Sequence, residues 1–419
     1  MIVNDSSRLD VVIFGATSFV GRILCSYYLQ HYGVNDKLRW GLAGRSRERL
    51  EALRRDLGDA AASLPVFVTD AADDEGLRAM CARTRVVIST VGPYAMHGEP
   101  LVKACAETGT DYCDITGEIQ WVRKMIDRYE GVAKTTGARI VHCCGFDSVP
   151  SDLGVFFLQR EAIRRFGKPC RRVKMRVRSI RGGASGGTVA SMLNLVKEAS
   201  RSPALRQELA NPYSLCAPDA SSGPPQPQVT RAAWDEDFGA WCGPFVMAAI
   251  NPRIVHRSNA LQARAYGADF CYDEAMLAGA GAKGRLAAMG ISAGVWGLIA
   301  VAALPPTRWL LGRLGPAQGA GPSEKDQKEG FFDIRFFGAT SDGRSLRGKV
   351  AADRDPGYSS TARMLGEAGI CLARDLANTA RVGGFWTPAA ALGKELLDRL
   401  TSNAVMSFEV EESRGTRHA

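Results

Sequence analysis

A regular alternation of short apolar runs and amphipathic runs over roughly the first 160 residues constrains the fold most. The apolar, β-branched runs lie at 10–14, 38–43, 65–68, 85–90, 111–115 and 138–143. Strands that alternate with helices at this spacing build βαβ units, and these units form a parallel sheet with right-handed crossovers. The sequence therefore predicts an α/β fold that begins with a parallel sheet.

The pattern changes after about residue 165, which predicts a second domain. A chain of 419 residues is too long for one ordinary core. The run "CRRVKMRVRSI" alternates like a half-exposed strand, a hairpin is expected around Asp342-Gly343, and helices are expected from Tyr358 onward. We expect an N-terminal sheet domain at 1–165, an α+β capping domain at 166–356, and a C-terminal helical region at 357–419 that packs back on the first domain.

Composition excludes several classes of function. The net charge of +9 suits an anionic ligand or an anionic membrane surface. The sequence has no basic run with interleaved aromatic residues, so nucleic acid is the least favoured partner. The 11 cysteines form no C-x-x-C pair and the 5 histidines are scattered, so we expect reduced thiols and no metal site. The N-terminus lacks the pattern of a signal peptide. A cytoplasmic protein is expected.

One uncharged stretch leaves two interpretations open. From Leu286 to Thr307 there is no charged residue, and the most apolar part is 286–304. The stretch reaches membrane-spanning length, and Gly290-x-x-x-Gly294 allows close helix contact. It is either a buried or dimer-interface helix, or a helix that rests on the inner face of the membrane. A full span is disfavoured because structured sequence of the same domain resumes after it. The sequence leaves the oligomeric state open.

The stretch "VVIFGATSFVG" has the order of parts that a dinucleotide site needs. A buried strand, Val11–Phe14, leads into a glycine turn, and a helix begins near Phe19. In Rossmann-type sheets the amides at such a helix start face the pyrophosphate. The glycines are spaced as Gly15-x-x-Ser18-x-x-Gly21 rather than G-x-G-x-x-G, so spacing alone is weak evidence. The predicted cofactor contacts in this turn are Gly15, Ala16, Thr17, Ser18, Phe19, Val20 and Gly21.

The end of the second strand, "GLAGRS", favours NADP(H) over NAD(H). An NAD site usually has an acidic residue here that accepts hydrogen bonds from the ribose hydroxyls. This sequence has Arg45 and Ser46 instead, and a guanidinium can bind a 2′-phosphate through two hydrogen bonds. The alternative is that Arg45 is a solvated arginine at a helix start.

Three further strand ends are expected to converge on the nicotinamide half of the cofactor. The fourth strand ends in "VVISTVGPYAMHGEP", the fifth in "YCDITGE" and the sixth in "CCGFDSVPSD". Ligands of open α/β sheets bind outside the carboxyl ends of the strands. The predicted cofactor contacts on the fourth strand end are Thr90, Val91, Gly92 and Pro93. The simpler interpretation of Asp147 or Ser148 is a cap for the helix that follows.

Several longer strings resemble the saccharopine dehydrogenase-like oxidoreductases. They are "GATSFVG", "LAGRS", "TVGPYAMHGEPLVKAC", "YCDITGE" and "GFDSVPSDLG". The later strings "SGGTVAS", "NPRIVHRSNAL", "DPGYSSTARML" and "GGFWTPAAALG" resemble the trans-acting enoyl reductase branch of that family. The similarity covers residues 10 to 410 or so. Ser18 departs from the family, which more often has glycine there.

The resemblance implies an NADPH-dependent reductase of α,β-unsaturated acyl thioesters. Such enzymes act beside polyketide synthases that lack a reducing domain, during the synthesis of long lipids. The implied partner is a lipid-like acyl thioester on a carrier protein of the synthase. Hydride addition to the β-carbon creates an enolate, which needs a hydrogen-bond donor, and a proton must then reach the α-carbon.

The candidate catalytic residues are Tyr94, Tyr112 and Asp147, with amides or the hydroxyl of the "GFDS" turn as further donors. Tyr94 is expected beside the nicotinamide because it follows Gly92 in a carboxyl-edge loop. Asp114 and Glu118 could relay protons or orient a donor. Tyr112 is alternatively a core tyrosine, and Glu118 alternatively the start of the next helix.

Two other functions compete with enoyl reduction. A saccharopine reductase-like enzyme for amino acids or imines would need several cations in the cleft, and the uncharged stretch argues against so polar a substrate. A non-catalytic NADP-binding, lipid-associated protein would keep the glycine turn and Arg45 but could lose the donors at the strand ends.

Overall fold

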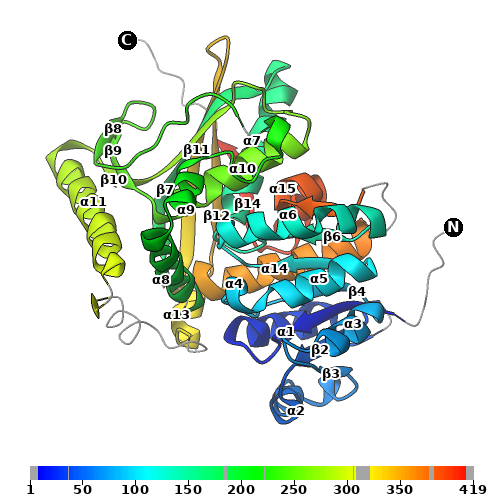
Figure 1. Cartoon of the computed structure of the whole chain (residues 1–419). Coiled ribbons are helices and arrows are strands. Elements are labelled where there is room, and N and C mark those ends of the chain that lie inside the picture. Colours follow the sequence, from blue (N-terminus) through cyan, green and yellow to red (C-terminus); the bar gives the residue numbers. More distant parts are fainter. Residues whose placement is uncertain are drawn as a thin grey trace.

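The computed structural model describes residues 8–411, apart from 36, 183–185, 221, 305, 308–320 and 377–381. These residues form two seven-stranded sheets (Figure 1). The first sheet is parallel throughout, in the order β13-β6-β5-β4-β1-β2-β3. Its strands are β1 (Leu9–Phe14), β2 (Trp40–Gly44), β3 (Val66–Val68), β4 (Thr84–Ser89), β5 (Asp111–Asp114), β6 (Arg139–Val141) and β13 (Gly384–Trp386). The predicted α/β fold is confirmed.

Helices cover both faces of the first sheet. Val11 and Ile13 of β1 enter the core beneath α1, α2 and α14, whereas Val12 and Phe14 enter the core beneath α3, α5 and α6. Strands buried on both faces read as unbroken apolar runs, and this explains the clarity of the sequence pattern. The helices are α1 (Phe19–Tyr32), α2 (Arg47–Asp56), α3 (Asp74–Ala82), α4 (Tyr94–His97), α5 (Glu99–Thr108), α6 (Ile119–Thr136) and α14 (Thr361–Ile370).

The second sheet is mixed, in the order β14-β12-β11-β7-β10-β9-β8. Only β10 and β7 run parallel; the other neighbours are antiparallel. The expected hairpin at Asp342-Gly343 joins β11 to β12. The strands are β7 (Cys170–Arg181), β8 (Ala233–Asp235), β9 (Ala240–Pro244), β10 (Cys271–Gly279), β11 (Phe331–Thr340), β12 (Ser345–Ala352) and β14 (Ser407–Glu411). These strands and the helices beside them are α+β in kind, and the domain boundaries expected from the sequence stay a prediction.

Helix α7 (Val149–Phe166) connects the two sheets. It begins just after β6 and packs on β11, β12 and β14 of the second sheet. Its Gly154 lies against Phe336, so close that an added Cβ would come within 2.3 Å of the ring. One continuous apolar cluster therefore includes Ile13 of the first sheet and Phe336 of the second.

The remaining helices surround the second sheet. Helix α8 contacts α9 and α11, and α10 packs on α7 (Figure 1). They are α8 (Gly186–Arg201), α9 (Pro203–Ala210), α10 (Asn251–Leu261), α11 (Gly281–Ala303), α13 (Glu324–Glu329), α15 (Pro388–Ala391) and α16 (Gly393–Ser402). Short turns of 3-10 or π-helix lie at Asp59–Ala61, Pro218–Ala220, Val246–Ala249, Pro356–Ser360 and Cys371–Asp375.

The C-terminal region differs from the helical region that the sequence predicts. Its described residues form three α-helices, but β13 pairs with β6 at the edge of the first sheet and β14 pairs with β12 in the second. A three-residue strand such as "GFW" is too short to show an alternating pattern, and a neighbouring strand decides its conformation. Helix α14 packs against α1, β1, β4 and β5 of the first sheet.

Candidate functional site

The glycine turn between β1 and α1 is packed so tightly that it has no room for side chains at Gly15 and Gly21. Gly15 has a φ of +86°, which glycine adopts freely and other residues rarely do. An added Cβ on Gly15 would lie 2.7 Å from Thr90 Oγ1, and one on Gly21 would lie 2.3 Å from the carbonyl oxygen of Gly15. The absence of side chains at both positions lets α1 approach the strand end closely.

The amides at the start of α1 are free to donate to an anion. The Ser18 hydroxyl caps α1 by accepting from the amide of Gly21 at 2.9 Å, and it also shares a 2.9 Å hydrogen bond with Thr90 Oγ1. Among the described residues, the amides of Thr17, Phe19 and Val20 have no acceptor. Unpaired amides at a helix N-terminus bind phosphate groups. The Ser18 hydroxyl therefore stabilises the turn, whereas the predicted contact Ala16 is fully buried beneath it.

We predict that Gly21→Ala weakens the binding of NADPH. The clash is with backbone atoms, including the carbonyl oxygen of Ala16 at 2.8 Å, so the turn itself must move. The dissociation constant for NADPH should rise at least roughly tenfold in a fluorescence titration, because the amides lose their alignment. Gly131→Ala in α6 is the matched control, since an added Cβ meets nothing within 4 Å there. Equal binding by both variants would contradict this role for Gly21.

The end of β2 carries an arginine, Arg45, whose guanidinium is free to bind a ligand. Arg45 is exposed and has no hydrogen bond or ion pair with any described residue. The neighbouring Ser46 caps α2, its hydroxyl accepting from the amide of Arg49 at 3.3 Å. Because β1 and β2 are adjacent and parallel, Arg45 lies at the same sheet edge as Gly15. This arrangement suits a 2′-phosphate bound by the guanidinium, while the Ser46 hydroxyl is already occupied.

The loop after β4 supports the glycine turn. The Thr90 hydroxyl donates to the carbonyl of Gly15 at 2.9 Å, and the Val91 side chain lies against the same residue. Pro93 precedes the short helix α4. Thr90 and Val91 thus act on the cofactor site by fixing Gly15; direct contact of Gly92 and Pro93 with the cofactor stays a prediction.

The three predicted loops do come together. The carboxylate of Glu118, after β5, accepts from the amides of Tyr94 at 2.8 Å and Ala95 at 3.1 Å. Asp114 at the end of β5 accepts from the amide of Cys143 at 3.1 Å, after β6. The buried carboxylate of Glu118 thus fixes the loop after β4 through two hydrogen bonds. Its side chain makes no capping hydrogen bond with α6, the helix that it precedes. The carboxylate of Asp114 fixes the loop after β6 through its hydrogen bond with the amide of Cys143.

The hydroxyls of Tyr94 and Tyr112 are both occupied inside the protein. Tyr94 Oη donates to the carbonyl of Ser89 at 2.9 Å, and Tyr112 Oη donates to Asp114 Oδ2 at 3.0 Å. Burial raises the pKa of both phenols well above the ordinary value. His142 Nδ1 also contacts Asp114 Oδ2, at 2.7 Å. The Asp114 carboxylate therefore interacts with the side chains of both Tyr112 and His142, which the sequence alone did not reveal. These contacts favour positioning roles for the two tyrosines over the donor role.

We predict that Tyr94→Phe mainly affects stability. The variant loses the hydrogen bonds to Ser89 and, at 3.4 Å, from the amide of Ile115. Loss of a buried hydroxyl and its partners should cost about 1–3 kcal/mol in the free energy of unfolding, with turnover within a few-fold of the parent. Thermal unfolding and steady-state turnover measured on one preparation check both parts. A large loss of turnover without a loss of stability would restore Tyr94 as a donor.

Asp147 is the one predicted catalytic residue whose polar atoms are free. It is half-buried, and it makes no hydrogen bond or ion pair with any described residue. Burial raises the pKa of its carboxyl from 3.8 to about 6. Its carboxylate faces Gly117, where an added Cβ would meet Ile250 at 3.3 Å and Asp147 Oδ2 at 3.8 Å. Asp147 does not cap α7, and Ser148 instead donates to Asn251 Oδ1 at 3.0 Å.

Residues from the C-terminal half contact the start of α1 and the loop after β6, and the sequence did not mark them individually. The ring of Tyr358 lies edge-on to Phe19, the first residue of α1, with centroids 4.8 Å apart. Thr361, at the start of α14, accepts from the amide of Phe146 at 3.0 Å. Both lie in "DPGYSSTARML", whose only signal was its resemblance to the family.

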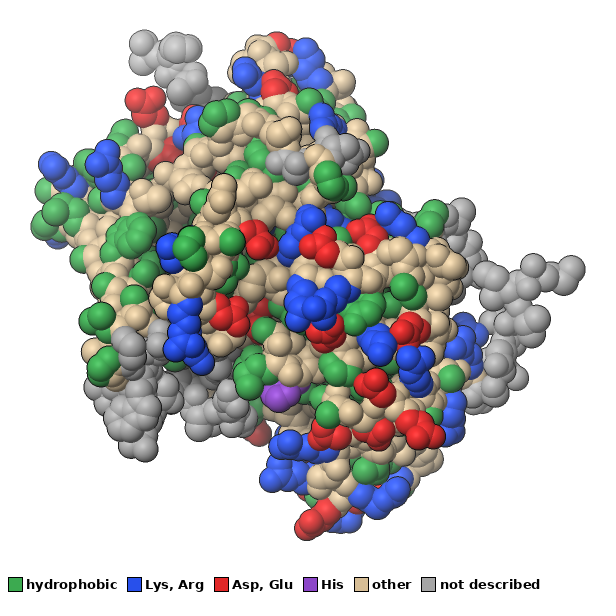
Figure 2. All heavy atoms as spheres, in the orientation of Figure 1, with side chains coloured by type: hydrophobic (Ala, Val, Ile, Leu, Met, Phe, Trp, Pro, Cys, Tyr) green, Lys and Arg blue, Asp and Glu red, His purple; other side chains and the backbone are tan. Residues whose placement is uncertain are grey.

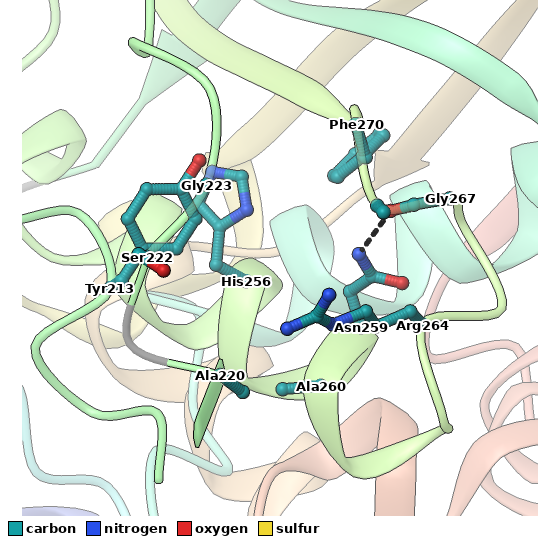
Figure 3. Close-up of a pocket in the computed structure, with 11 residues that line it drawn as sticks. Tyr213, Ala220, Ser222, Gly223, His256, Asn259, Ala260, Arg264, Gly267 and Phe270 are labelled. Carbon is teal, nitrogen blue, oxygen red and sulfur yellow. Dashed lines mark hydrogen bonds between the residues drawn. The ribbon is translucent and has the colours of Figure 1, made fainter. Parts of the chain in front are cut away.

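Two cavities in the second unit are poor candidates for the reaction. Figure 3 shows one near α10, where Asn259 Nδ2 donates to the carbonyl of Gly267 at 2.9 Å; its volume of about 20 Å³ beside His256 has room for about one water. The other, of about 220 Å³, lies over Lys174 and Arg176. Asp235 pairs with both cations, at 2.9 and 2.7 Å. Among the described residues, no three histidine, cysteine or acidic side chains form a metal site.

Comparisons with known proteins agree with this geometry. Residues 11–141 match the model of the saccharopine dehydrogenase NADP binding domain. A relative from Mycobacterium tuberculosis (strain H37Rv), named as a trans-acting enoyl reductase, is 40% identical over 413 residues, which cover 95% of this chain and 97% of the relative. The trans-acting enoyl reductase of Mycobacterium leprae is 39% identical over 417 residues, or 96% and 98% of the two chains. The chain belongs to the trans-acting enoyl reductase family.

Solved structures place this member of the trans-acting enoyl reductases in a wider fold group. Apo saccharopine dehydrogenase from Saccharomyces cerevisiae has the same overall fold, with a TM-score of 0.51 at 13% identity over 96% of this chain and 99% of that one. The first sheet is an NADP-binding domain of this type. The residues present fit the cofactor, because the glycine turn leaves the amides of α1 free to donate to a pyrophosphate and exposed Arg45 could pair with a 2′-phosphate.

Proposed function

We propose that the protein is an NADPH-dependent trans-acting enoyl reductase that reduces an α,β-unsaturated acyl thioester in complex lipid or polyketide synthesis. The observation that carries the proposal is an unpaired, half-buried carboxyl, Asp147, at the strand edge that also carries the glycine cradle. When bound, the cofactor supplies a hydride to the β-carbon of the substrate. The chain must supply everything else, namely orientation, charge stabilisation and a proton.

In the proposed mechanism, Asp147 delivers the proton to the α-carbon. The carboxyl must be protonated to do so, and burial favours the protonated form. The amides of Gly117, Gly145 and Asp147 have no acceptor among the described residues, so they are available to the thioester oxygen as negative charge develops there. Glu118 and Asp114 hold the loops that carry these groups.

The surroundings of Asp147 support an apolar substrate. Ile115 and Ile250 are half-buried beside the loops, and Phe146 packs on Phe332 with centroids 5.0 Å apart. A dicarboxylic amino acid would need cations here, but the cations of the second cavity, Lys174 and Arg176, already pair with Asp235. These contacts support an acyl chain over the amino-acid alternative.

The substrate is proposed to arrive on the carrier protein of a polyketide synthase, because the names of the relatives describe an enzyme that acts in trans. We also propose that the protein works in the cytoplasm with peripheral contact to a membrane. The test is consumption of NADPH with an enoyl thioester on a carrier protein and, in parallel, with an oxo acid plus an amine. The expected result is that NADPH is consumed in the assay with the enoyl thioester and not in the assay with the oxo acid and the amine. Consumption only with the oxo acid and amine would assign the imine chemistry instead.

A further inference from the structure

Helix α11 exposes apolar side chains on an unusual scale. It is the one helix of the described chain that is long and apolar enough to cross a membrane, with a mean hydropathy of 1.9 over a window that is only 11% buried. Seven of the fifteen large apolar residues that the described chain exposes lie on it or at its end: Leu286, Met289, Trp296, Leu298, Ile299, Val301 and Leu304. Figure 2 shows apolar side chains on the left flank, where Figure 1 places α11. Soluble proteins rarely leave such a surface uncovered.

Only one narrow stripe of α11 contacts its own chain. Gly284, Ala288 and Ala302 are buried, and Gly243 of β9 lies so close to Ile291 that an added Cβ would come within 2.8 Å of its side chain. Trp296 Nε1 donates to the carbonyl of Thr230 at 2.7 Å. The rest of the circumference is exposed. One flat partner surface, including a second copy docked on Gly290 and Gly294, would leave much of this arc in water.

The topology argues against a simple crossing of a bilayer by α11. Strand β10 leads into the helix and β11 follows it, and both strands border β7 in one sheet. A crossing in α11 would therefore need a second crossing before β11, and no other helix of the described residues is long and apolar enough for one. An apolar helix with this constraint can lie in the plane of the interface.

Exposed cations lie in the first turn of the helix and next to the residue that binds Trp296. Lys283 and Arg285 are exposed at the N-terminal end, and exposed Arg231 follows Thr230, the residue that binds Trp296. The helix itself carries no acidic residue. Basic side chains beside an apolar surface match anionic lipid headgroups.

We propose that α11 is an in-plane docking helix that inserts into the surface of an anionic phospholipid bilayer. The proposal deepens the peripheral contact in the proposed function. Helix α8 packs on α11, and its Ser191 donates to Glu118 Oε1 at 2.9 Å. Docking through α11 would thus hold the loops of the candidate site beside the lipid surface, where a long acyl substrate resides.

Co-sedimentation of the full chain with vesicles tests the proposal. The parent protein should bind vesicles of phosphatidylglycerol and phosphatidylcholine more tightly than vesicles of phosphatidylcholine alone. The triple variant Leu286→Gln, Met289→Gln, Ile299→Gln should lose at least roughly tenfold in partitioning, because three apolar side chains no longer enter lipid. The control Val132→Gln, Ile163→Gln changes exposed apolar residues of α6 and α7 and should bind like the parent.

Labelling separates the in-plane helix from other arrangements. In vesicle-bound Ala282→Cys and Ala303→Cys, a membrane-impermeant maleimide should reach both ends of α11; native thiols give little background because ten of eleven are buried. One protected end would indicate a span and overturn the proposal. Unchanged partitioning of the triple variant would also overturn it, as would a dimer that the triple variant dissociates without any vesicle binding. These readouts need no reductase activity, so failure of the catalytic proposal is distinguishable.

Discussion

Asp147→Asn should lower turnover by roughly two orders of magnitude or more while NADPH binding stays within a few-fold of the parent. Asparagine keeps the size of the side chain but cannot give up a proton. The carboxyl is unpaired and half-buried, so no neighbouring described group substitutes for it. Steady-state turnover with a saturating enoyl thioester and a separate NADPH titration measure the two quantities.

The pH dependence of turnover should differ between the parent and Asp147→Asn, and a purely structural role of Asp147 would not produce this difference. Burial raises the pKa of Asp147 to about 6, and the protonated carboxyl is the active form. Turnover of the parent should therefore be high below pH 6 and fall as the pH rises through this value. The variant should lose this slope. Because the pKa is raised in the folded state, the fold loses stability as the pH rises from about 3.8 to about 6, so Asp147→Asn should not be less stable than the parent above pH 6.

Asp152→Asn is the matched control for Asp147→Asn. Burial raises the pKa of Asp152 to about 7, but its two oxygens already accept from Ser258 Oγ at 2.5 Å and from the amide of Ala389 at 2.8 Å. The control should lose stability, by about 1–3 kcal/mol in the free energy of unfolding, and keep its turnover. If the two variants lost turnover equally, the assignment of Asp147 as the proton donor would fail.

Arg45→Ala should erase the preference for NADPH over NADH. The guanidinium is exposed and unpaired among the described residues, so it is free to bind a 2′-phosphate. Loss of a charge-assisted contact of about 2–3 kcal/mol should raise the dissociation constant for NADPH by roughly 100-fold. The dissociation constant for NADH should barely change. Fluorescence titration with both nucleotides measures the difference.

Arg55→Ala removes the same charge from the far end of α2 and should leave both nucleotide affinities unchanged. A preference for NADPH that survives in Arg45→Ala would show that another cation binds the 2′-phosphate. Equal weakening by the two variants would indicate a general effect of net charge.

The sequence predicted the first sheet well because local and tertiary signals agree there. Strand β1, Gly15 and the start of α1 follow from one short stretch, since buried strands are continuously apolar and the turn needs glycine. The convergence of the loops after β4, β5 and β6 followed from parallel topology alone. Short strands such as β13 depend on a neighbouring strand and left no local pattern.

The sequence was less informative about which polar atoms are free. Tyr94, Tyr112 and Asp147 all follow or lie in strands at the correct edge, and nothing local distinguishes them. Tertiary contacts occupy the two hydroxyls through Ser89 and Asp114, and leave Asp147 unpaired. The uncharged stretch posed the same difficulty. Its composition fits a buried helix as well as an exposed one, and only the packing of α11 against β9 reveals how little of it is covered.

Isotope transfer tests the central claim most directly. The purified protein is incubated with NADPH that carries deuterium in the transferable C4 position and with a trans-2-enoyl thioester, and the product is analysed by mass spectrometry and NMR. The account predicts a saturated thioester with deuterium on the β-carbon and a solvent-derived proton on the α-carbon. An unreduced enoyl thioester, or deuterium transferred only to an imine carbon when an oxo acid and an amine are supplied, would contradict it.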